Sequence, residues 1–321
     1  MTPRSLQNHF HAFGVRDGIV GIAHAVPYLA TRYVLRRPTL RRRVFDYTLE
    51  LDARDPGISK TLAVFGKREL EHRAILTSVL KSGMTCWDIG ANIGYYAIME
   101  ARLVGPQGKV YAVEPAPANV ALLRRNIAQN NVGGIVEAIS GAVSNCDGTA
   151  TFHLSALSNV HSFHPVSFRT GERVSSMTGK TIPVRTFDVP TFLCGRRKVD
   201  LVRMDIEGHE VEVFEAIARA VRAGQFRGMV LFETHFPKYD DAQHNMRDRF
   251  RELVGLGYRP RIMASTERGT PRFLAAGYAP SAHIRTDGEI RTLFTDVRPD
   301  DAERFLCDTG GVRTILLACG S

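Results

Sequence analysis

The stretch Asp88-Ile-Gly-Ala-Asn-Ile-Gly-Tyr95 follows a short apolar run and opens a helical pattern. A strand, a tight turn and a helix in this order are typical of a doubly wound α/β fold, which binds ligands at the carboxyl ends of its strands. Gly90 and Gly94 let the backbone turn sharply and approach a ligand closely. The carboxylate of Asp88 and the D-x-G-x-N-x-G spacing differ from the G-x-G-x-x-G dinucleotide pattern. The stretch therefore indicates a ligand that carries an ammonium group or hydroxyls.

On both sides of this turn, short apolar runs alternate with helical patterns, and this alternation predicts a mostly parallel sheet. Two more strands are expected around a polar loop over 155–180, and two further runs are expected to close the sheet. The expected core strands are 84–89, 109–113, 135–143, 199–204 and 228–232, the strands at the loop are 149–154 and 181–187, the closing runs are 258–263 and 312–318, and the helices lie at 95–104, 118–129, around 211–217 and at 246–254.

The first 65 residues show no strand-like alternation of apolar and polar residues. Pro27 and Pro38 interrupt them, and the pattern becomes regular only from about Arg68. We therefore predict a helical N-terminal extension over 1–65 and a single catalytic domain over 66–321, with a soft boundary between them.

Glu114 ends the second expected core strand, directly before Pro115. An acid at this place, one strand after a glycine-rich turn, can accept both hydroxyls of a ribose. Two charge-assisted hydrogen bonds of about 1.5–3 kcal/mol each would make Glu114 a major determinant of nucleoside binding.

Acids and histidines gather at the ends of two later strands, in Asp205-Ile-Glu-Gly-His-Glu210 and in Glu233-Thr-His235. Parallel strands end at the same edge of a sheet, so we expect an acid/base site beside the nucleoside site. Asp205, Glu207 and His209 are the predicted catalytic residues. His209 has an ordinary pKa near neutrality and is the natural proton acceptor, whereas Asp205 is better placed but needs a raised pKa or a metal. Both alternatives stay open at this point.

Taken together, these motifs resemble the FkbM-type S-adenosylmethionine (SAM)-dependent methyltransferases. The resemblance covers residues 68 to 235 and rests on residues 88–96, on Val113-Glu114-Pro115 with Asn126 downstream, and on residues 199–210. It implies a Rossmann-like class I methyltransferase sheet with a reversed final hairpin, SAM as cofactor, and methylation of a hydroxyl on a sugar or a secondary metabolite. Arg203 stands where the family has lysine, and the tail after Gly257 is longer than usual.

The resemblance also implies where SAM lies, across the ends of the first two core strands. Gly90 and Gly94 would approach its methionine part, Asp88 would help to position it, Glu114 would hold the ribose and Ala142 would flank the adenine. The expected cofactor-binding residues are Asp88, Gly90, Asn92, Gly94, Tyr95, Glu114 and Ala142.

Two other functions are weighed against this one. A nicotinamide-dependent oxidoreductase uses the same class of fold, but the missing G-x-G-x-x-G argues against it. A basic adaptor for nucleic acid or membranes would explain an arginine cluster near the N-terminus, but it leaves the three aligned motifs without a role. The expected partner is therefore a small hydroxyl-bearing substrate rather than nucleic acid.

Several charged or metal-binding side chains have plainer interpretations. His161 and His164 lie in the polar loop and either line a substrate entrance or sit on its surface. The acids Glu210, Glu212 and Glu215 are expected on a solvated helix face. Hard cations need several oxygen ligands, and the obvious candidates Asp205, Glu207 and Glu233 are few, so no metal is predicted.

The chain carries a net charge of +9, and Arg32, Arg36, Arg37, Arg41, Arg42 and Arg43 crowd one segment. This segment is either a solvated face or a contact site for an anionic partner.

The five cysteines of the chain are scattered and no two have C-x-x-C spacing, which predicts reduced thiols in a cytoplasmic enzyme. No apolar run approaches the roughly 20 residues that span a bilayer.

Overall fold

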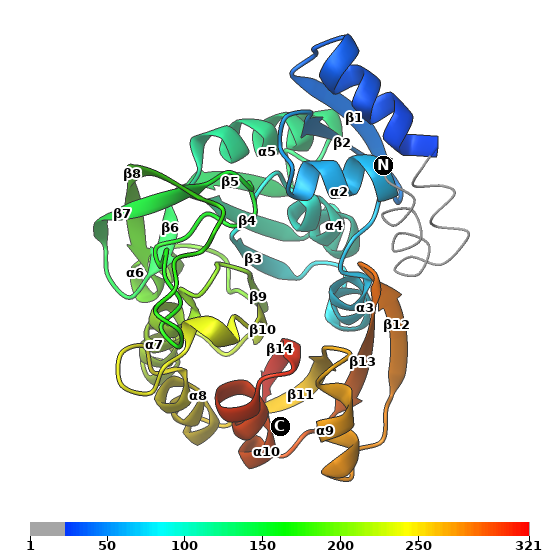
Figure 1. The fold of residues 1–321 in the computed structure, drawn as a ribbon. Helices are drawn as coiled ribbons and strands as arrows, with labels where there is room; N and C mark the ends of the chain where they lie inside the picture. Colours follow the sequence, from blue (N-terminus) through cyan, green and yellow to red (C-terminus); the bar gives the residue numbers. More distant parts are fainter. Residues whose placement is uncertain (1–22, 321) are drawn as a thin grey trace.

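The structure is a computed structural model that describes residues 23–320, and a nine-stranded sheet runs through its centre (Figure 1). In spatial order the strands are β12 (Ala282–Thr286), β13 (Glu289–Thr295), β11 (Tyr258–Ser265), β14 (Val312–Cys319), β10 (Met229–Glu233), β9 (Leu201–Met204), β3 (Thr85–Ile89), β4 (Lys109–Glu114) and β5 (Val136–Ser140).

The five strands from β10 to β5 are all parallel to one another. Strand β14 runs antiparallel between β10 and β11, so the mostly parallel sheet and its reversed final hairpin are both confirmed. Beyond β11, the antiparallel strands β13 and β12 extend the sheet. This pair was not predicted, because its short runs of alternating residues carry charges on both faces.

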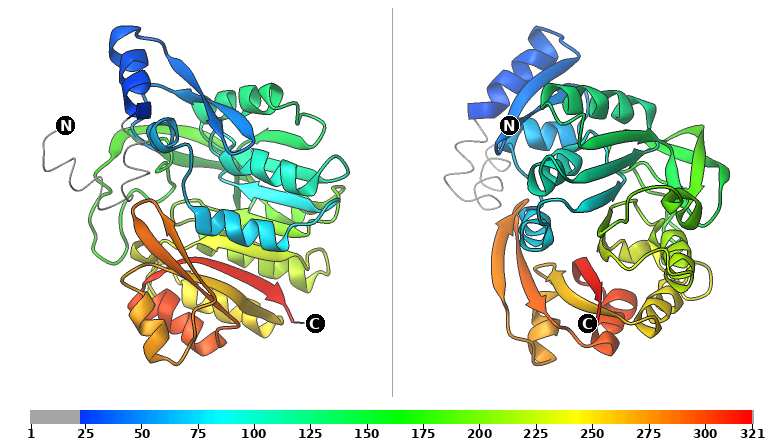
Figure 2. Two further views of the ribbon diagram at one scale, coloured as in Figure 1. Left: turned by 90° about the vertical axis from the view of Figure 1, so that its right-hand side faces the viewer. Right: turned by 180° about the vertical axis from the view of Figure 1, so that it is seen from behind.

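Helices cover both faces of the sheet, as a doubly wound fold requires (Figures 1 and 2). Neighbouring residues of β3 illustrate this, because Cys86 and Trp87 are both buried but belong to opposite hydrophobic clusters. One face carries α3 (Leu70–Val79), α4 (Tyr95–Val104) and α5 (Pro117–Gln129), and the other carries α6 (Val189–Leu193), α7 (Glu210–Arg222), η2 (Phe236–Lys238), α8 (Met246–Gly255), α9 (Thr270–Ala275), α10 (Pro299–Glu303) and η3 (Arg304–Thr309).

The N-terminal extension is only partly helical. Residues 23–29, η1 (Ala30–Val34) and α2 (Ile58–Phe65) are helical as predicted, but β1 (Thr39–Val44) and β2 (Tyr47–Asp52) form an antiparallel hairpin. In β2, buried Tyr47, Leu49 and Leu51 alternate with half-buried polar residues, a two-residue period typical of strands. The expectation of helices and connections alone was therefore wrong for 39–52, and its part over 1–22 lies outside the described residues.

The predicted boundary at residue 65 stays a prediction. Buried Leu49 of the hairpin and Leu62 of α2 belong to the same hydrophobic cluster as Ile98 of α4. The extension and the sheet thus share one apolar core.

A second, three-stranded sheet has the order β6-β8-β7, with β6 (Ala142–Ser144), β7 (Gly148–Ser155) and β8 (Met177–Asp188). The single strand expected over 135–143 is therefore divided at Gly141, where the chain passes from the large sheet to the small one. Gly141 has a φ of 144°, and a Cβ there would lie 2.5 Å from the Phe187 ring. The loop between β7 and β8, over 156–176, lies beside the carboxyl edge of the large sheet.

Within residues 23–320, the helices all lack the length and hydropathy of a membrane-spanning segment. The cytoplasmic location expected from the cysteines stays a prediction.

Candidate active site

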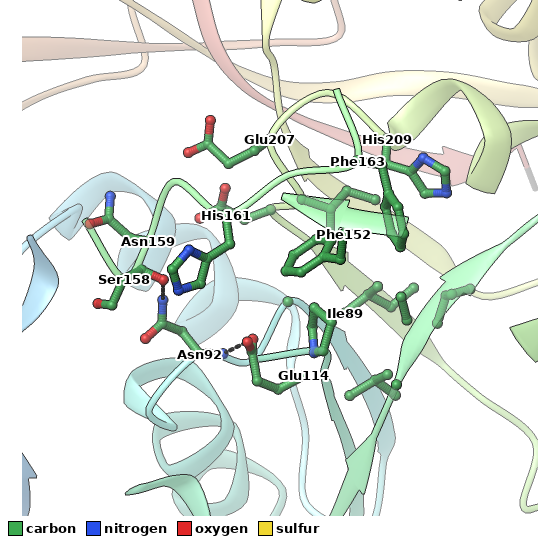
Figure 3. A pocket seen from close by; sticks show the side chains of 18 residues that line it. Ile89, Asn92, Glu114, Phe152, Ser158, Asn159, His161, Phe163, Glu207 and His209 are labelled. Carbon is green, nitrogen blue, oxygen red and sulfur yellow. Dashed lines mark hydrogen bonds between the residues drawn. The ribbon is translucent and has the colours of Figure 1, made fainter. Parts of the chain in front are cut away.

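An open cavity lies at the carboxyl ends of β3, β4 and β9 (Figure 3). Seven of the ten predicted site residues line it: Gly90, Asn92, Glu114, Ala142, Asp205, Glu207 and His209. The cofactor and acid/base motifs, far apart in the chain, therefore meet in one cavity.

The turn after β3 brings the two motifs into contact. Gly90 has a φ of 83°, and a Cβ at this position would lie only 2.3 Å from the backbone oxygen of Asp205. Asn92 also has a left-handed backbone, with a φ of 51°. The glycine is thus needed for the close approach of β3 and the segment that follows β9.

Gly94 and Tyr95 are predicted cofactor residues that do not line the cavity. A Cβ at Gly94 would lie 2.8 Å from Leu123 of α5, so this glycine permits helix packing. The buried Tyr95 hydroxyl donates to the Arg68 carbonyl, and the Tyr95 carbonyl accepts from Tyr47. Tyr95 thus connects α4 to the N-terminal extension.

Asp88 is fully buried beneath the cavity and does not line it either. Its Oδ1 accepts a hydrogen bond of 3.0 Å from Arg203, whose second terminal nitrogen lies 3.1 Å from Asp205 Oδ2. The guanidinium of Arg203 also stacks on the Tyr96 ring, 3.9 Å from its centroid. Burial raises the pKa of Asp88, and the Arg203 charge opposes that rise. Asp88 and Arg203 therefore tie the end of β3 to Asp205.

The Glu114 carboxylate has one acceptor position left for a ligand. Its carboxylate accepts from the backbone N–H groups of Asn92 and Ala116, both at 2.9 Å, and from the Asn119 amide at 3.2 Å. A carboxylate has about four acceptor positions, so one remains. Burial raises the pKa of Glu114 to about 7, against the effect of these three donors.

The loop over 156–176 closes one side of the cavity. The Ser158 carbonyl accepts from the Asn92 and Asn119 side chains, at 3.0 and 3.1 Å. Asp55 of the N-terminal extension accepts from the Ser158 hydroxyl at 2.8 Å. Sequence reasoning missed several lining residues, among them Phe152, Ser158, Asn159 and Phe163, while His161 lines the cavity as one of its two interpretations allowed.

Glu207 is the most unusual acid of the second motif. It has a φ of 52° in the tight turn before α7, and its side chain lines the cavity. Burial raises the pKa of Glu207 to about 7, although His235 opposes the rise. In Figure 3, Glu207 lies in the upper part of the view and Glu114 lies below it.

His235 lies among carboxylates behind Glu207. Its Nδ1 is 2.8 Å from Glu210, and its Nε2 is 3.6 to 3.8 Å from oxygens of Asp205, Glu207 and Glu233. Burial alone would lower the pKa of His235, but these acids, Glu210 first, hold it well above its usual range. His235 is therefore an imidazolium at neutral pH.

His209 is buried at the beginning of α7, and its ring lies 4.5 Å from that of Phe163. Burial lowers the pKa of His209 to about 4, so the near-neutral value on which its choice as base depended does not hold in the folded chain. Its Nε2 lies 3.0 Å from the Ser144 hydroxyl. The lowered pKa favours a neutral His209 ring, and its Nε2 has Ser144 as a hydrogen-bond partner.

Two of the three acids of α7, Glu210 and Glu212, do not lie on a solvated face as expected, whereas Glu215 is partly exposed. Glu210 is fully buried and accepts from His235 and from Tyr239. Glu212 is half-buried among three histidines. The helix pattern alone could not reveal these partners, because they come from other segments of the chain.

Three groups of side chains in the described residues have the spacing of a cation site, although the sequence predicted no metal. Two of them share Asp205, which already pairs with Arg203: one adds Glu207 and His235, and the other adds Glu69 and Glu233, which both pair with Arg313. The third combines two histidines and one acid: His164, His209 and Glu212.

Comparisons with known proteins assign the sequence to a family. The sequence model of the FkbM methyltransferase domain matches residues 88–260. The chain is 28% identical to hexuronic acid methyltransferase AglP of Haloferax volcanii over 149 residues, which is 46% of this chain and 55% of AglP. It is 29% identical to methyltransferase sdnD of Sordaria araneosa over 153 residues, 40% of this chain and 59% of sdnD.

These matches span little more than half the length of either relative. Among solved structures, the M. jannaschii TYW2 complex with AdoMet aligns with 81% of this chain and 87% of its own, at 15% identity and a TM-score of 0.39.

Proposed function

The chain belongs to the FkbM methyltransferase family, and on this premise we propose that it transfers the methyl group of SAM to a hydroxyl oxygen of a sugar or a secondary metabolite. One observation carries the proposal: a single cavity is lined both by Glu114, at the nucleoside position, and by Glu207, at the acid/base position. The family assignment leaves the nicotinamide-dependent alternative without support.

The residues of the cavity fit the cofactor. SAM supplies an activated methyl group on a sulfonium when it is bound. Glu114 would accept from a ribose hydroxyl with its open position, and the backbone around Gly90 and Asn92 would face the methionine part. Ala142 would flank the adenine, together with the Phe152 ring. Gly94, Tyr95 and Asp88 would act indirectly, by holding α4 and the end of β3 in place.

We assign the proton acceptor to Glu207, rather than to His209. Glu207 lines the cavity and, among residues 23–320, has no ion pair with arginine or lysine, whereas Asp205 is held by Arg203. Glu207 would accept the proton that the acceptor hydroxyl loses when its oxygen receives the methyl group supplied by bound SAM. Asp205 orients the site through Arg203, and His235 balances the charge that Glu207 carries before the transfer.

The chemistry of this end of the cavity favours an acceptor with several hydroxyls. Carboxylates accept hydrogen bonds from hydroxyls, and the acids Asp205 and Glu207 both line the cavity here. An acceptor with its own negative charge would be repelled by them. A neutral sugar or polyhydroxylated metabolite therefore fits better than the carboxylate of a uronic acid.

Methyl transfer from isotopically labelled SAM tests the proposal. The purified chain is incubated with extracts and with panels of neutral sugars and uronic acids, and methylated products are identified by mass spectrometry. Mild base then distinguishes the two oxygens, since a methyl ether survives it and a methyl ester is hydrolysed. We expect base-stable products. Transfer only to carboxyl groups or to nitrogen would refute O-methylation of a hydroxyl.

The basic N-terminal segment supports a second contact, with an anionic membrane surface. In the described residues, five of the seven exposed large hydrophobic side chains fall between 26 and 35: Val26, Leu29, Tyr33, Val34 and Leu35. The neighbouring Arg36, Arg37 and Arg41 are exposed. Apolar side chains flanked by arginines are typical of segments that lie on anionic lipid.

Sedimentation with vesicles tests this contact. We expect binding to vesicles that contain phosphatidylserine, weakened by salt, and little binding to phosphatidylcholine alone. Changing Arg36, Arg37 and Arg41 to glutamine should release the chain from the vesicles. The same change at three exposed arginines elsewhere, Arg124, Arg268 and Arg285, should have little effect. Equal binding by both variants would refute a specific role of the N-terminal arginines in membrane binding.

A further inference from the structure

Three segments of the chain bring histidines to a single carboxylate beside the cavity. His164 comes from the loop after β7, His209 and Glu212 from the start of α7, and His244 from the turn before α8. His164 Nε2 and His209 Nδ1 lie 3.2 Å apart, and each lies 3.4 Å from a Glu212 oxygen. We propose that His164, His209 and Glu212 bind a divalent transition-metal cation such as Zn²⁺.

The hydrogen bonds of His209 leave a lone pair directed at this centre. The Asn145 amide donates to Glu215, so its oxygen faces Ser144 and accepts from that hydroxyl. This chain of donors favours the tautomer in which His209 Nε2 carries the ring proton and donates to Ser144. The unprotonated Nδ1 of His209 therefore faces the Glu212 carboxylate at 3.4 Å. Two acceptors at this distance repel each other unless a proton or a cation lies between them.

His244 supports the carboxylate from the other side. Its Nδ1 lies 2.7 Å from the Lys238 backbone carbonyl, an acceptor only, so this nitrogen carries a proton. Its Nε2 lies 3.1 and 3.2 Å from the two Glu212 oxygens. Partners of this kind, which orient a ligating carboxylate, are a regular part of metal sites. His244 is thus a positioning residue for Glu212.

The spacing and the ligand types fit the same class of metal. Zinc binds histidine nitrogen and carboxylate oxygen at about 2.0–2.2 Å, which places neighbouring ligands of a tetrahedral site about 3.3–3.5 Å apart. The two histidine nitrogens lie 3.2 Å apart, and each lies 3.4 Å from a different Glu212 oxygen, Oε1 for His164 and Oε2 for His209. Two histidines and one carboxylate are also a known catalytic zinc set, which leaves one coordination position open.

The two groups of side chains that share Asp205 are weaker candidates for a cation site. Their charges already face the guanidinium groups of Arg203 and Arg313, and a further cation there would displace or repel these side chains. By contrast, Glu212 forms ion pairs only with histidines within the described residues.

A cation at this place would hold the loop over 156–176 against the cavity. His164 is the loop's ligand, while Ser158, His161 and Phe163 of the same loop line the cavity. The loop is fixed near His164 by Lys238, which donates to the Val166 carbonyl at 3.0 Å. Metal binding and SAM binding should therefore favour the same loop position and strengthen each other.

Calorimetric titration of Zn²⁺ into the chelator-treated full chain tests the site. We expect one equivalent to bind with a micromolar or lower Kd. His164→Asn and Glu212→Gln should each weaken binding at least 100-fold. His283→Asn, which removes an exposed histidine of β12, should leave it unchanged. Absence of saturable binding, or equal binding by the three variants, would overturn the proposal.

Cobalt spectroscopy of the parent chain gives a second test that does not depend on how the variants fold. Co²⁺ in a four- or five-coordinate site absorbs visible light much more strongly than octahedral Co²⁺, and we expect the stronger spectrum at one equivalent. A weak octahedral spectrum would mean surface binding and would contradict the site. Zn²⁺ should also tighten SAM binding several-fold, and no change in SAM affinity would refute the link to the loop.

Discussion

The Glu114 end and the Glu207 end of the cavity both lie where parallel strands stop, yet their charges are balanced in different ways. Three neutral N–H donors surround Glu114. Glu207 lies in a group of acids around the imidazolium of His235. The first arrangement fixes one carboxylate for binding uncharged hydroxyls. Burial raises the pKa of both Glu114 and Glu207 to about 7, so the second arrangement differs in the histidine that lies beside its carboxylate.

The difference between the ends predicts that removing the Glu207 charge affects turnover and leaves binding almost unchanged. In Glu207→Gln, we expect kcat to fall about 10²- to 10⁴-fold, the usual contribution of a general base, while the Kd for SAM changes less than about threefold. Glu215→Gln, at a partly exposed acid of α7, is the control and should keep parent kcat. A kcat within twofold of the parent in Glu207→Gln would remove this residue from the mechanism.

At Glu114 we expect the opposite result, in which the affinity for SAM is lost. Loss of a charge-assisted hydrogen bond of about 1.5–3 kcal/mol should raise the Kd for SAM about 10- to 100-fold in Glu114→Ala, measured by calorimetry. Glu114→Gln keeps the shape of the side chain and separates lost charge from lost packing. Glu137→Gln, at an exposed acid of β5, should bind SAM like the parent. Equal affinities in all four proteins would contradict the ribose assignment.

A smaller effect should appear in the pH dependence of cofactor binding. The pKa of Glu114 is raised to about 7, and the ionised form is the better acceptor. As pH falls from 8 to 6, protonation should therefore weaken SAM binding by roughly tenfold. The sign is fixed by the raised pKa, since the carboxylate is lost as pH drops through it. Glu114→Gln should lose this part of the profile, and an identical profile in both proteins would show that another group titrates.

The same two ends also differ in how well the sequence predicted them. Gly90, Asn92 and Glu114 come from two contiguous motifs at strand ends, and all three line the cavity. Gly94 and Tyr95 belong to the same motif, but helix geometry turns them toward Leu123 and the N-terminal extension. Motif membership thus predicted the position of the turn, but could not predict the direction of each side chain.

At the Glu207 end, contacts between distant segments decide the chemistry. Glu210 and Glu212 read as a solvated helix face because their histidine partners lie up to 48 residues away in sequence, as His164 does from Glu212. The loop that carries His161, Phe163 and His164 has no periodicity from which its position could be inferred. Burial, which lowers the pKa of His209 and raises that of Glu207, follows from this packing and not from local sequence.

Calorimetric titration of SAM and of NAD into the purified full chain tests the central claim most directly. If Glu114 and the turn at Gly90 form a SAM site, SAM and S-adenosylhomocysteine should each bind at one equivalent, and NAD should bind at least about 100-fold more weakly. A chain that binds NAD as tightly as SAM, or binds neither, would contradict the account.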